Sequence, residues 1–93
     1  MQDKITSEKL KKYFEITEKA LKKVKENVIP EEEDDASEII EMATNYVNDA
    51  HHFEEKEDLV NAYGALNYAH GWIDCGVRLG IFDVNDDTLF TVK

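Results

Sequence analysis

The sequence has 93 residues, 42% of them hydrophobic and 34% charged, with a formal net charge of −10; this composition is typical of one small globular domain and excludes a disordered chain. No apolar run reaches the roughly 20 residues that a membrane-spanning helix needs, and the first residues lack the apolar segment of a signal peptide, so we expect no membrane association. The single cysteine, Cys75, cannot form an intrachain disulfide, which favours a cytoplasmic protein.

The charge is distributed unevenly along the chain. Residues 1–25 hold eight lysines and four acidic residues, whereas residues 26–93 hold three basic and seventeen acidic residues. The simpler interpretation is a basic helix packed beside acidic neighbours. The alternative is a basic surface for RNA or anionic lipid. Because the acidic remainder would repel phosphate, we expect no nucleic acid partner.

A first helix is predicted over residues 7–28. Its core-facing residues recur at spacings of three and four, which places them on one narrow face. They are Leu10, Tyr13, Phe14, Thr17, Ala20, Leu21, Val24 and Val28. Ser7 is the expected N-cap. Pro30 ends the helix, because a proline pushes the preceding residue out of the α region.

A second helix is predicted over residues 35–54, after the acidic linker PEEEDD. Asp35 with Glu38 fits a capping-box-like start, with an acid at the cap and a glutamate three positions later. The predicted core face is broad. It consists of Ala36, Ile39, Ile40, Met42, Ala43, Tyr46, Val47, Ala50 and Phe53. The following connector, EEKED, is short, so the second and third helices should be antiparallel neighbours.

A third helix is predicted over residues 57–79. Gly80 is a natural residue just past its end, and Ile81 suits the hydrophobic contact of a Schellman-type ending. The tail that follows is too short for another helix. We expect Leu89 and Phe90 to dock on the bundle, or to meet a partner if they do not.

These elements predict an all-α protein, because no segment shows the alternation of a β-strand. We expect residues 1–93 to form a single domain. Its architecture should be an antiparallel, up-and-down three-helix bundle with a short docked C-terminal tail.

Residues 64–80, GALNYAHGWIDCGVRLG, differ from the lysine- and glutamate-rich sequence around them, since they hold all four glycines, the only tryptophan and the only arginine. On a helical wheel one broad face must belong to the core. It consists of Leu59, Ala62, Leu66, Ala69, Ile73, Gly76 and Val77. The apolar surface is widened to one side by Tyr68, Trp72, Cys75 and Leu79. We expect the neighbouring helices to cover that flank as well, and to bury Cys75 as a small hydrophobic residue.

A polar line runs along the remaining side of the predicted third helix. Spacings of three and four stack its members, which are Tyr63, Asn67, His70, Asp74 and Arg78. Gly64 and Gly71 lie beside this line, and a glycine inside a helix costs about 1 kcal/mol relative to alanine. Two glycines on one side indicate that something approaches the backbone there. It could be a helix of the same protein, a second subunit or a ligand.

Three interpretations of the polar line remain open. In the first, His70, Asp74 and Arg78 form ordinary side-chain pairs one helical turn apart. In the second, the polar line and the two glycines form a protein interface. In the third, they form a small-molecule or catalytic site, in which Asp74 orients His70 as a general base and Arg78 holds an anion. Asn67 would supply amide hydrogen bonds there.

We expect no metal ion and no cofactor. His51, His52 and His70 each have an acidic residue three or four positions later, a spacing that could place two ligands on one side of a helix. The order of histidine and glutamate is the reverse of that in helical di-iron bundles, and the first helix presents no carboxylate on its core face. The sequence contains no phosphate-binding glycine loop, no CxxC and no HExxH motif.

The segment AYGALNYAHGWIDCGVRLGIFDV, followed by LF, resembles the archaeal family called domain of unknown function 357. The resemblance covers about residues 59–92, and its recognisable core is NYAHGWID-x-G-x-RLG; the first two predicted helices match in pattern and length. The resemblance implies an up-and-down three-helix bundle similar in shape to a spectrin repeat. It implies no activity, cofactor or partner. Similar segments are joined to nucleotidyltransferase-like domains in some archaeal chains, which implies an accessory or interaction module.

The leading functional hypothesis is a non-enzymatic protein-interaction or accessory module. It would use the polar line and glycines of the third helix to bind a protein partner or a second copy in a homodimer. The alternative is a binding or catalytic site for an anionic metabolite or a nucleotide, centred on His70, Asp74 and Arg78. No residue is assigned as catalytic in the leading hypothesis.

Overall fold

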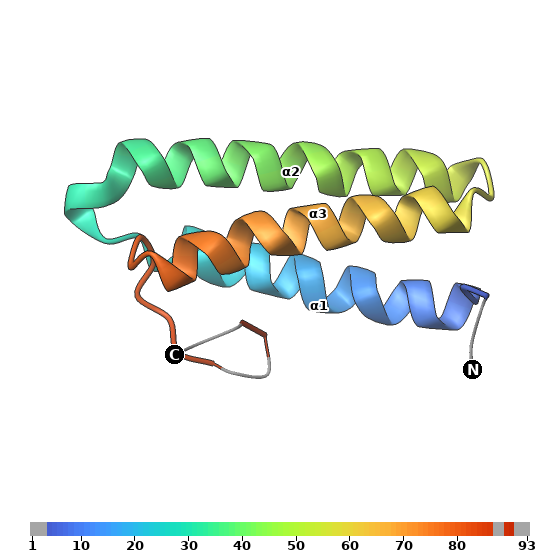
Figure 1. Ribbon diagram of the computed structural model, residues 1–93, viewed down its shortest axis with the longest axis horizontal. Coiled ribbons are helices and arrows are strands. Elements are labelled where there is room, and N and C mark those ends of the chain that lie inside the picture. Colours follow the sequence, from blue (N-terminus) through green and yellow to red (C-terminus); the bar gives the residue numbers. More distant parts are fainter. Residues whose placement is uncertain (1–3, 87–88, 91–93) are drawn as a thin grey trace.

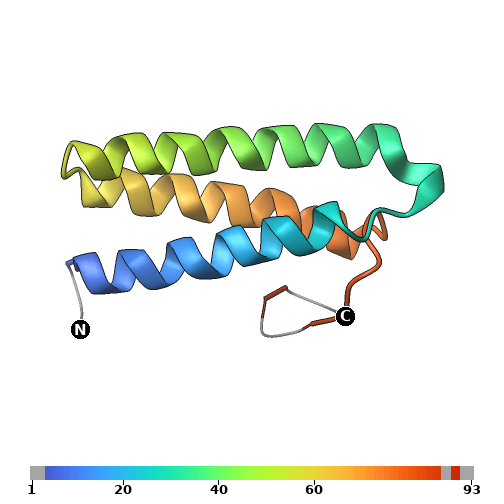
Figure 2. The ribbon, with the colours of Figure 1, turned by 180° about the vertical axis from the view of Figure 1, so that it is seen from behind.

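The computed structural model describes residues 4–86 and 89–90. They form three long helices and one turn of 3-10 helix. These are α1 (Ser7–Lys25), η1 (Pro30–Glu32), α2 (Glu33–Glu55) and α3 (Leu59–Arg78). Successive helices run in opposite directions, and α3 packs against both of the others (Figure 1, Figure 2). The predicted all-α, antiparallel three-helix bundle is therefore confirmed.

The described residues contain no β-strand beyond one isolated antiparallel bridge between Val28 and Phe82. None of the helices in this part of the chain is long and apolar enough to cross a membrane. The molecule is elongated along the helix axes, with extents of 41 × 25 × 16 Å.

The N-cap of α1 is Thr6, and the prediction of Ser7 is wrong. Thr6 has an extended backbone, and its hydroxyl oxygen accepts a hydrogen bond from the Lys9 N–H at 3.1 Å. Ser7 is already the first helical residue. Both residue types can cap a helix, and the backbone just outside the helix decides which of them does so.

α1 ends at Lys25, short of the predicted end at Val28. The chain leaves the helix here because the residues that follow pair with the segment after α3. Val28 forms its bridge with Phe82, and the Ile29 N–H donates to the Ile81 carbonyl at 3.0 Å. Tertiary hydrogen bonds thus replace the helical ones that the apolar spacing predicted.

α2 begins at Glu33, directly after η1, and the predicted cap at Asp35 is wrong. Glu32, the residue before α2, makes no side-chain capping bond. Asp34 and Asp35 lie within the first turn, where carboxylates interact favourably with the positive end of the helix dipole. Pro30 is the first residue of η1. The first position of a helix tolerates proline, because its N–H would have no partner within the helix. Pro30 therefore starts the next helical segment.

The turn between α2 and α3 is short, as predicted, and it makes these helices antiparallel neighbours. Glu57 adopts a left-handed conformation with φ of 59°, which lets the chain reverse. Asp58 then caps α3, because its side chain accepts the Asn61 N–H at 3.2 Å. α3 therefore begins at Leu59, slightly later than predicted.

The end of α3 is the predicted Schellman-type ending. Gly80 has a positive φ of 77°. The Gly80 N–H donates to the Val77 carbonyl at 3.1 Å, and the Ile81 N–H donates to the Gly76 carbonyl at 2.9 Å. This pair of bonds defines the motif, and Ile81 is buried beneath it.

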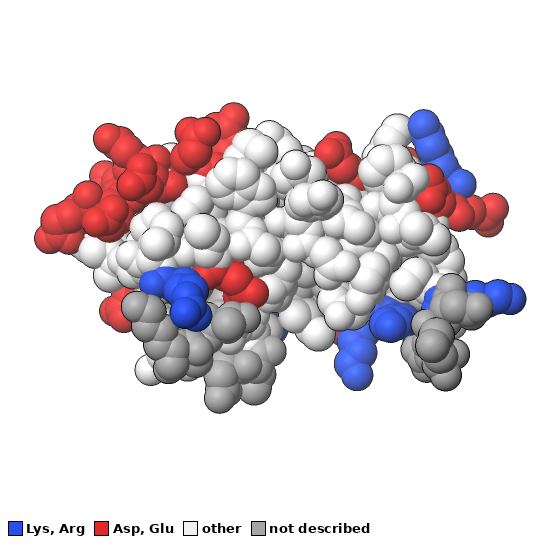
Figure 3. Space-filling view, viewed as in Figure 1, with Lys and Arg blue, Asp and Glu red and all other residues white. Residues whose placement is uncertain are grey.

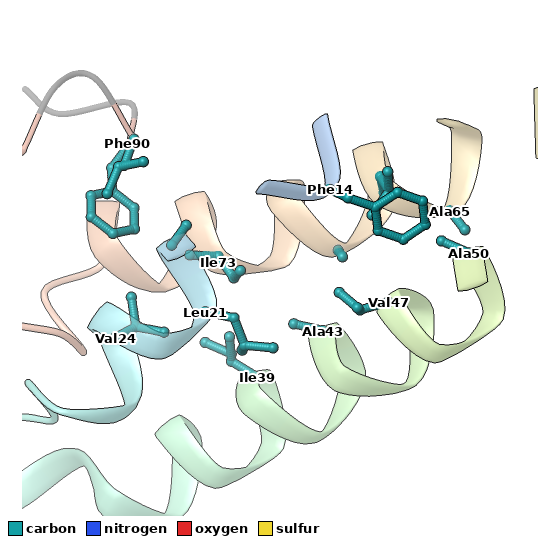
Figure 4. Packing of buried hydrophobic residues seen from close by; sticks show 14 of the residues in the cluster. Phe14, Leu21, Val24, Ile39, Ala43, Val47, Ala50, Ala65, Ile73 and Phe90 are labelled. Carbon is teal, nitrogen blue, oxygen red and sulfur yellow. The ribbon is translucent and has the colours of Figure 1, made fainter. Parts of the chain in front are cut away.

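The core combines bulky side chains of α1 and the tail with many small side chains of α2 and α3 (Figure 4). Alanines recur every seven residues along the facing sides of these two helices. They are Ala36, Ala43 and Ala50 in α2 and Ala62 and Ala69 in α3, all of them fully or almost fully buried. Small residues at such positions let two helices pack closely. The packing of α2 with α3 is accordingly the most extensive in the bundle.

The C-terminal tail docks on the bundle, as predicted. Leu89 and Phe90 are 7% and 4% exposed, and Ile81 and Phe82 are buried as well. The ring of Phe82 lies over Gly76. The tail therefore closes the end of the core that α1 leaves open beyond Lys25.

Candidate functional site

The two glycines beside the predicted polar line face open space. A Cβ atom added to Gly64 or Gly71 would meet no neighbouring atom within 4 Å. Neither has a positive φ, since Gly80 is the only glycine with one in the described residues. No helix of this chain therefore approaches the backbone at either position.

The side of α3 that carries these glycines is apolar. We call it the outer face of α3. It comprises Val60, Gly64, Tyr68, Gly71, Trp72, Cys75 and, at the C-cap, Leu79. Several of its members and Asn67 line a shallow groove of about 630 Å³.

The prediction that neighbouring helices cover this flank is wrong. Tyr68 is 66% exposed, Leu79 is 70% exposed and Trp72 is 36% exposed. Cys75 is exposed too, and the prediction of a buried cysteine is also wrong. The reason is that α1 and α2 pack mainly against the side of α3 that holds Leu66 and Ile73. Only the edge of the outer face meets α2, where the ring of Tyr46 stacks on that of Tyr68 with centroids 5.4 Å apart, and Tyr68 stays largely exposed among the described residues.

The predicted polar line separates into parts with different surroundings. At its start, the ring of Tyr63 meets the ring of Tyr13 edge to face, with centroids 4.6 Å apart. The Lys9 ammonium lies 5.7 Å above the Tyr63 ring. The hydrogen bond with Tyr63, followed by burial, raises the pKa of the Tyr13 phenol. Tyr63 is thus part of the contact between α1 and α3.

His70 connects α3 to α1 and to the tail. Its Nε2 lies 2.6 Å from the Leu89 carbonyl oxygen. A carbonyl only accepts hydrogen bonds, so Nε2 carries the proton. In the neutral ring Nδ1 is then an acceptor, and it lies 3.4 Å from the hydroxyl oxygen of the fully buried Thr17. His70 therefore gives a buried hydroxyl its partner and anchors the tail.

The predicted pairs along the polar line are only partly present. Asp74 Oδ1 lies 3.9 Å from His70 Nε2, a looser contact than the one to Leu89. Arg78 is exposed and forms no ion pair with the residues that the structure describes, so the expected pair with Asp74 does not form.

A second cavity, of about 660 Å³, lies between α1, α3 and the tail. It brings together three residues of the polar line, namely Asn67, His70 and Asp74. Lys9 and Lys12 of α1 line the same cavity, whereas Arg78 does not. Sequence reasoning missed the two lysines, because their position beside α3 depends on how α1 packs. The only hint in the sequence is that Lys12 precedes Tyr13, a residue of the predicted core face, and so lies near the edge of that face.

Of the two remaining histidines, His52 is exposed and His51 serves a contact between α1 and α2. His51 Nε2 lies 3.0 Å from Glu18 Oε1, and the His51 ring stacks on Phe14 with centroids 4.3 Å apart. Across residues 4–86 and 89–90, no group of three or more His, Cys, Asp or Glu side chains is arranged to hold a metal ion.

Comparison with known proteins gives a family but no activity. A family model described as "Protein of unknown function (DUF357)" matches residues 12–82, which cover most of α1, all of α2 and α3, and the start of the tail. No curated protein and no solved structure matches the chain significantly. Because the family model spans well over half of the sequence, the chain belongs to the DUF357 family, whose function is unknown.

Proposed function

We propose that this protein is a non-enzymatic interaction module that binds a protein surface through the outer face of α3. The observation that carries the proposal is the distribution of exposed apolar side chains. In the described part of the chain, all the large hydrophobic residues that are exposed belong to this one face: Val60, Tyr68, Trp72 and Leu79. Contiguous apolar surface of this kind marks interaction sites, because a soluble monomer otherwise rarely leaves it open to water.

The two glycines of the outer face, Gly64 and Gly71, support the same proposal. Each weakens an isolated helix by about 1 kcal/mol relative to alanine. Packing within the chain does not require these glycines, since a side chain at Gly64 or Gly71 would meet no neighbouring atom. The glycines would instead let a helix of another molecule pack closely on the outer face, because two helices can approach where side chains are absent.

The charge distribution also favours a protein surface as the partner. Between Asp58 and Asp74 the sequence of α3 contains no Asp, Glu, Lys or Arg. Figure 3 views the molecule from the side on which α3 lies in front; uncharged residues occupy its centre, and acidic residues lie toward its two ends, most of them at the left. Depletion of charge at the centre with aromatic residues present is typical of interface cores.

The test is site-specific photo-crosslinking in cells of the source organism. A benzophenone amino acid replaces Trp72 on the outer face or, as a matched control, Glu41 on the exposed side of α2. We expect a discrete crosslinked product at position 72, identified by mass spectrometry, and none at position 41. Equal or absent crosslinking at the two positions would contradict the proposal.

A second candidate function is the binding of an anionic small molecule in the cavity between α1 and α3. The observation in its favour is the pair of lysines, Lys9 and Lys12, that line this cavity with Asn67 and His70. Both ring nitrogens of His70 already have partners, which favours binding over general-base catalysis. The lysines would take the anion-binding role that the sequence assigned to Arg78.

This second candidate is tested by thermal unfolding with pyrophosphate and with a nucleoside triphosphate as probes. A binding site predicts a rise in melting temperature that Lys12→Glu abolishes. Lys11→Glu is the matched control, because Lys11 is exposed on the same helix and does not line the cavity. The candidate fails if both variants respond to the probes as the unmodified protein does.

A further inference from the structure

We infer that the occupant of the outer face of α3 is the same face of a second copy of this chain, packed antiparallel about a two-fold axis. This inference rests on the proposed function, since it names the partner of that same surface. It is carried by the positions of the two glycines, by the charges at the two ends of α3 and by the size of the face.

The spacing of the glycines suits a two-fold axis. Gly64 and Gly71 are two helical turns apart on one side of α3, with Asn67 and Tyr68 midway between them. A two-fold axis at this midpoint places Gly64 of one copy opposite Gly71 of the other, and the reverse contact follows by symmetry. Both points of closest approach then lack side chains. A partner that crosses α3 at a single point would need only one glycine.

The charges at the ends of α3 favour the antiparallel direction. Glu57 and Asp58 stand at its N-terminal end, whereas Arg78 is the last helical residue, exposed and without an ion pair among the described residues. In the antiparallel arrangement Arg78 comes beside Glu57 of the second copy, twice by symmetry. The two helix dipoles also run in opposite directions. A parallel arrangement would instead bring Arg78 close to Arg78 of the second copy.

The acidic character of the protein does not prevent this contact. The net charge is −10, but the uncharged stretch of α3 keeps acidic groups away from the centre of the face. Repulsion between the acidic ends acts over a distance and is screened beyond about 8 Å at physiological ionic strength.

The outer face has the dimensions of a weak dimer interface. α3 has 20 residues and is therefore about 30 Å long. A contact between two single helices of this length belongs to the class of interfaces that bury less than about 1,200 Å² in total. We therefore expect a dimer that dissociates on dilution, with a dissociation constant in the micromolar range.

Disulfide trapping tests the inference directly. In the antiparallel pair, Val60 of one copy lies opposite Cys75 of the other. Oxidation of Val60→Cys, with the native Cys75 present, should give a dimer joined by two disulfides, while the unmodified protein stays largely unlinked. The two cysteines cannot pair within one chain, because fifteen residues of helix separate them by about 22 Å. The matched control is Val60→Cys combined with Cys75→Ser, which should stay largely unlinked, because the antiparallel arrangement keeps the two copies of position 60 too far apart for a disulfide.

Charge reversal provides a measurement without disulfides. Arg78→Glu should raise the dissociation constant, measured by sedimentation equilibrium, roughly fivefold, and Glu57→Arg should do the same. The double variant should restore the original value, because the two charges have exchanged places. Failure of the double variant to do so would overturn the antiparallel arrangement, as would efficient crosslinking of Cys75 to Cys75 in the unmodified protein.

The remaining outcomes separate this inference from the proposed function. A protein that stays monomeric up to millimolar concentration would overturn the second copy as occupant. Crosslinking from position 72 to a different protein would then leave the proposed function standing. A strictly monomeric protein without any crosslinked product at position 72 would overturn both.

Discussion

Gly76 and Gly71 lie on the same helix, but they occupy opposite environments. A Cβ atom at Gly76 would lie 2.5 Å from Phe82 Cε2 and 2.9 Å from Ile39 Cδ1, so the packing of the tail and α2 requires a glycine there. A Cβ atom at Gly71 would meet nothing within 4 Å. The fold of the single chain thus explains one glycine and not the other. The inner side of α3 is therefore packed by other parts of the chain, whereas much of its outer face is open to solvent.

The largest expected difference between the two sides is in the free energy of unfolding, and it is measured by truncating Ile73 on the inner side and its sequence neighbour Trp72 on the outer face. Ile73 is fully buried, and Ile73→Ala should lower the free energy of unfolding by about 2–5 kcal/mol through lost burial and the cavity left behind. Trp72→Ala should lower it by less, because Trp72 is 36% exposed and loses less burial than the fully buried Ile73. Urea unfolding of both variants under dilute conditions measures the difference. Equal losses would mean that the outer face is packed within its own chain.

The attachment of the tail to the inner side is broken by His70→Ala. The variant removes the hydrogen bond to the Leu89 carbonyl and leaves the buried Thr17 hydroxyl without its partner. We expect a loss of about 1–3 kcal/mol in unfolding free energy. Hydrogen exchange should show faster exchange at the Leu89 and Phe90 amides. The exposed His52→Ala provides the control and should change neither quantity.

Gly76→Ala tests the inner glycine. Alanine is favoured over glycine in a helix by about 1 kcal/mol. Overpacking against the buried Phe82 ring and the Ile39 side chain costs about 1–3 kcal/mol. We expect a net loss of about 1–2 kcal/mol, measured by thermal or urea unfolding. A more stable variant would show that the tail shifts away from α3 at little cost.

Gly71→Ala is the matched change on the outer face and has the opposite expected sign. At concentrations where the protein is monomeric, it should raise the free energy of unfolding by up to about 1 kcal/mol, because alanine is the better helix former and meets no neighbour. At high concentration the same change should weaken self-association several-fold, since it adds a methyl group where the two backbones meet. Unfolding and sedimentation of one sample series measure both effects. A variant that is more stable but associates normally would leave Gly71 unexplained.

Part of the candidate site could be predicted from the sequence. The spacing placed Gly64 and Gly71 on the side of α3 that faces away from the core, and the structure shows open space beside both. The polar line was placed there too, but the structure turns Tyr63 and His70 toward α1. The flank formed by Tyr68, Trp72 and Leu79 was assigned to neighbouring helices instead. Periodicity shows that such residues share a side, but it does not show whether another helix reaches that side. Side-chain pairs were predicted least well, because His70 turns to Leu89, which is distant in sequence.

The sequence by itself determined the three helices, their order and direction, the ending of α3 at Gly80 and the apolar character of the tail. These features follow from short-range physics: the period of the α-helix, the preference of glycine for a positive φ and the short connectors. Only the tertiary structure decided where α1 ends, because Val28 pairs with Phe82 rather than continuing the helix. It also decided that Lys9 and Lys12 share a cavity with His70 and that Trp72 remains exposed. Each of these depends on which elements meet in space, since α1, α2 and the tail all pack mainly on one side of α3.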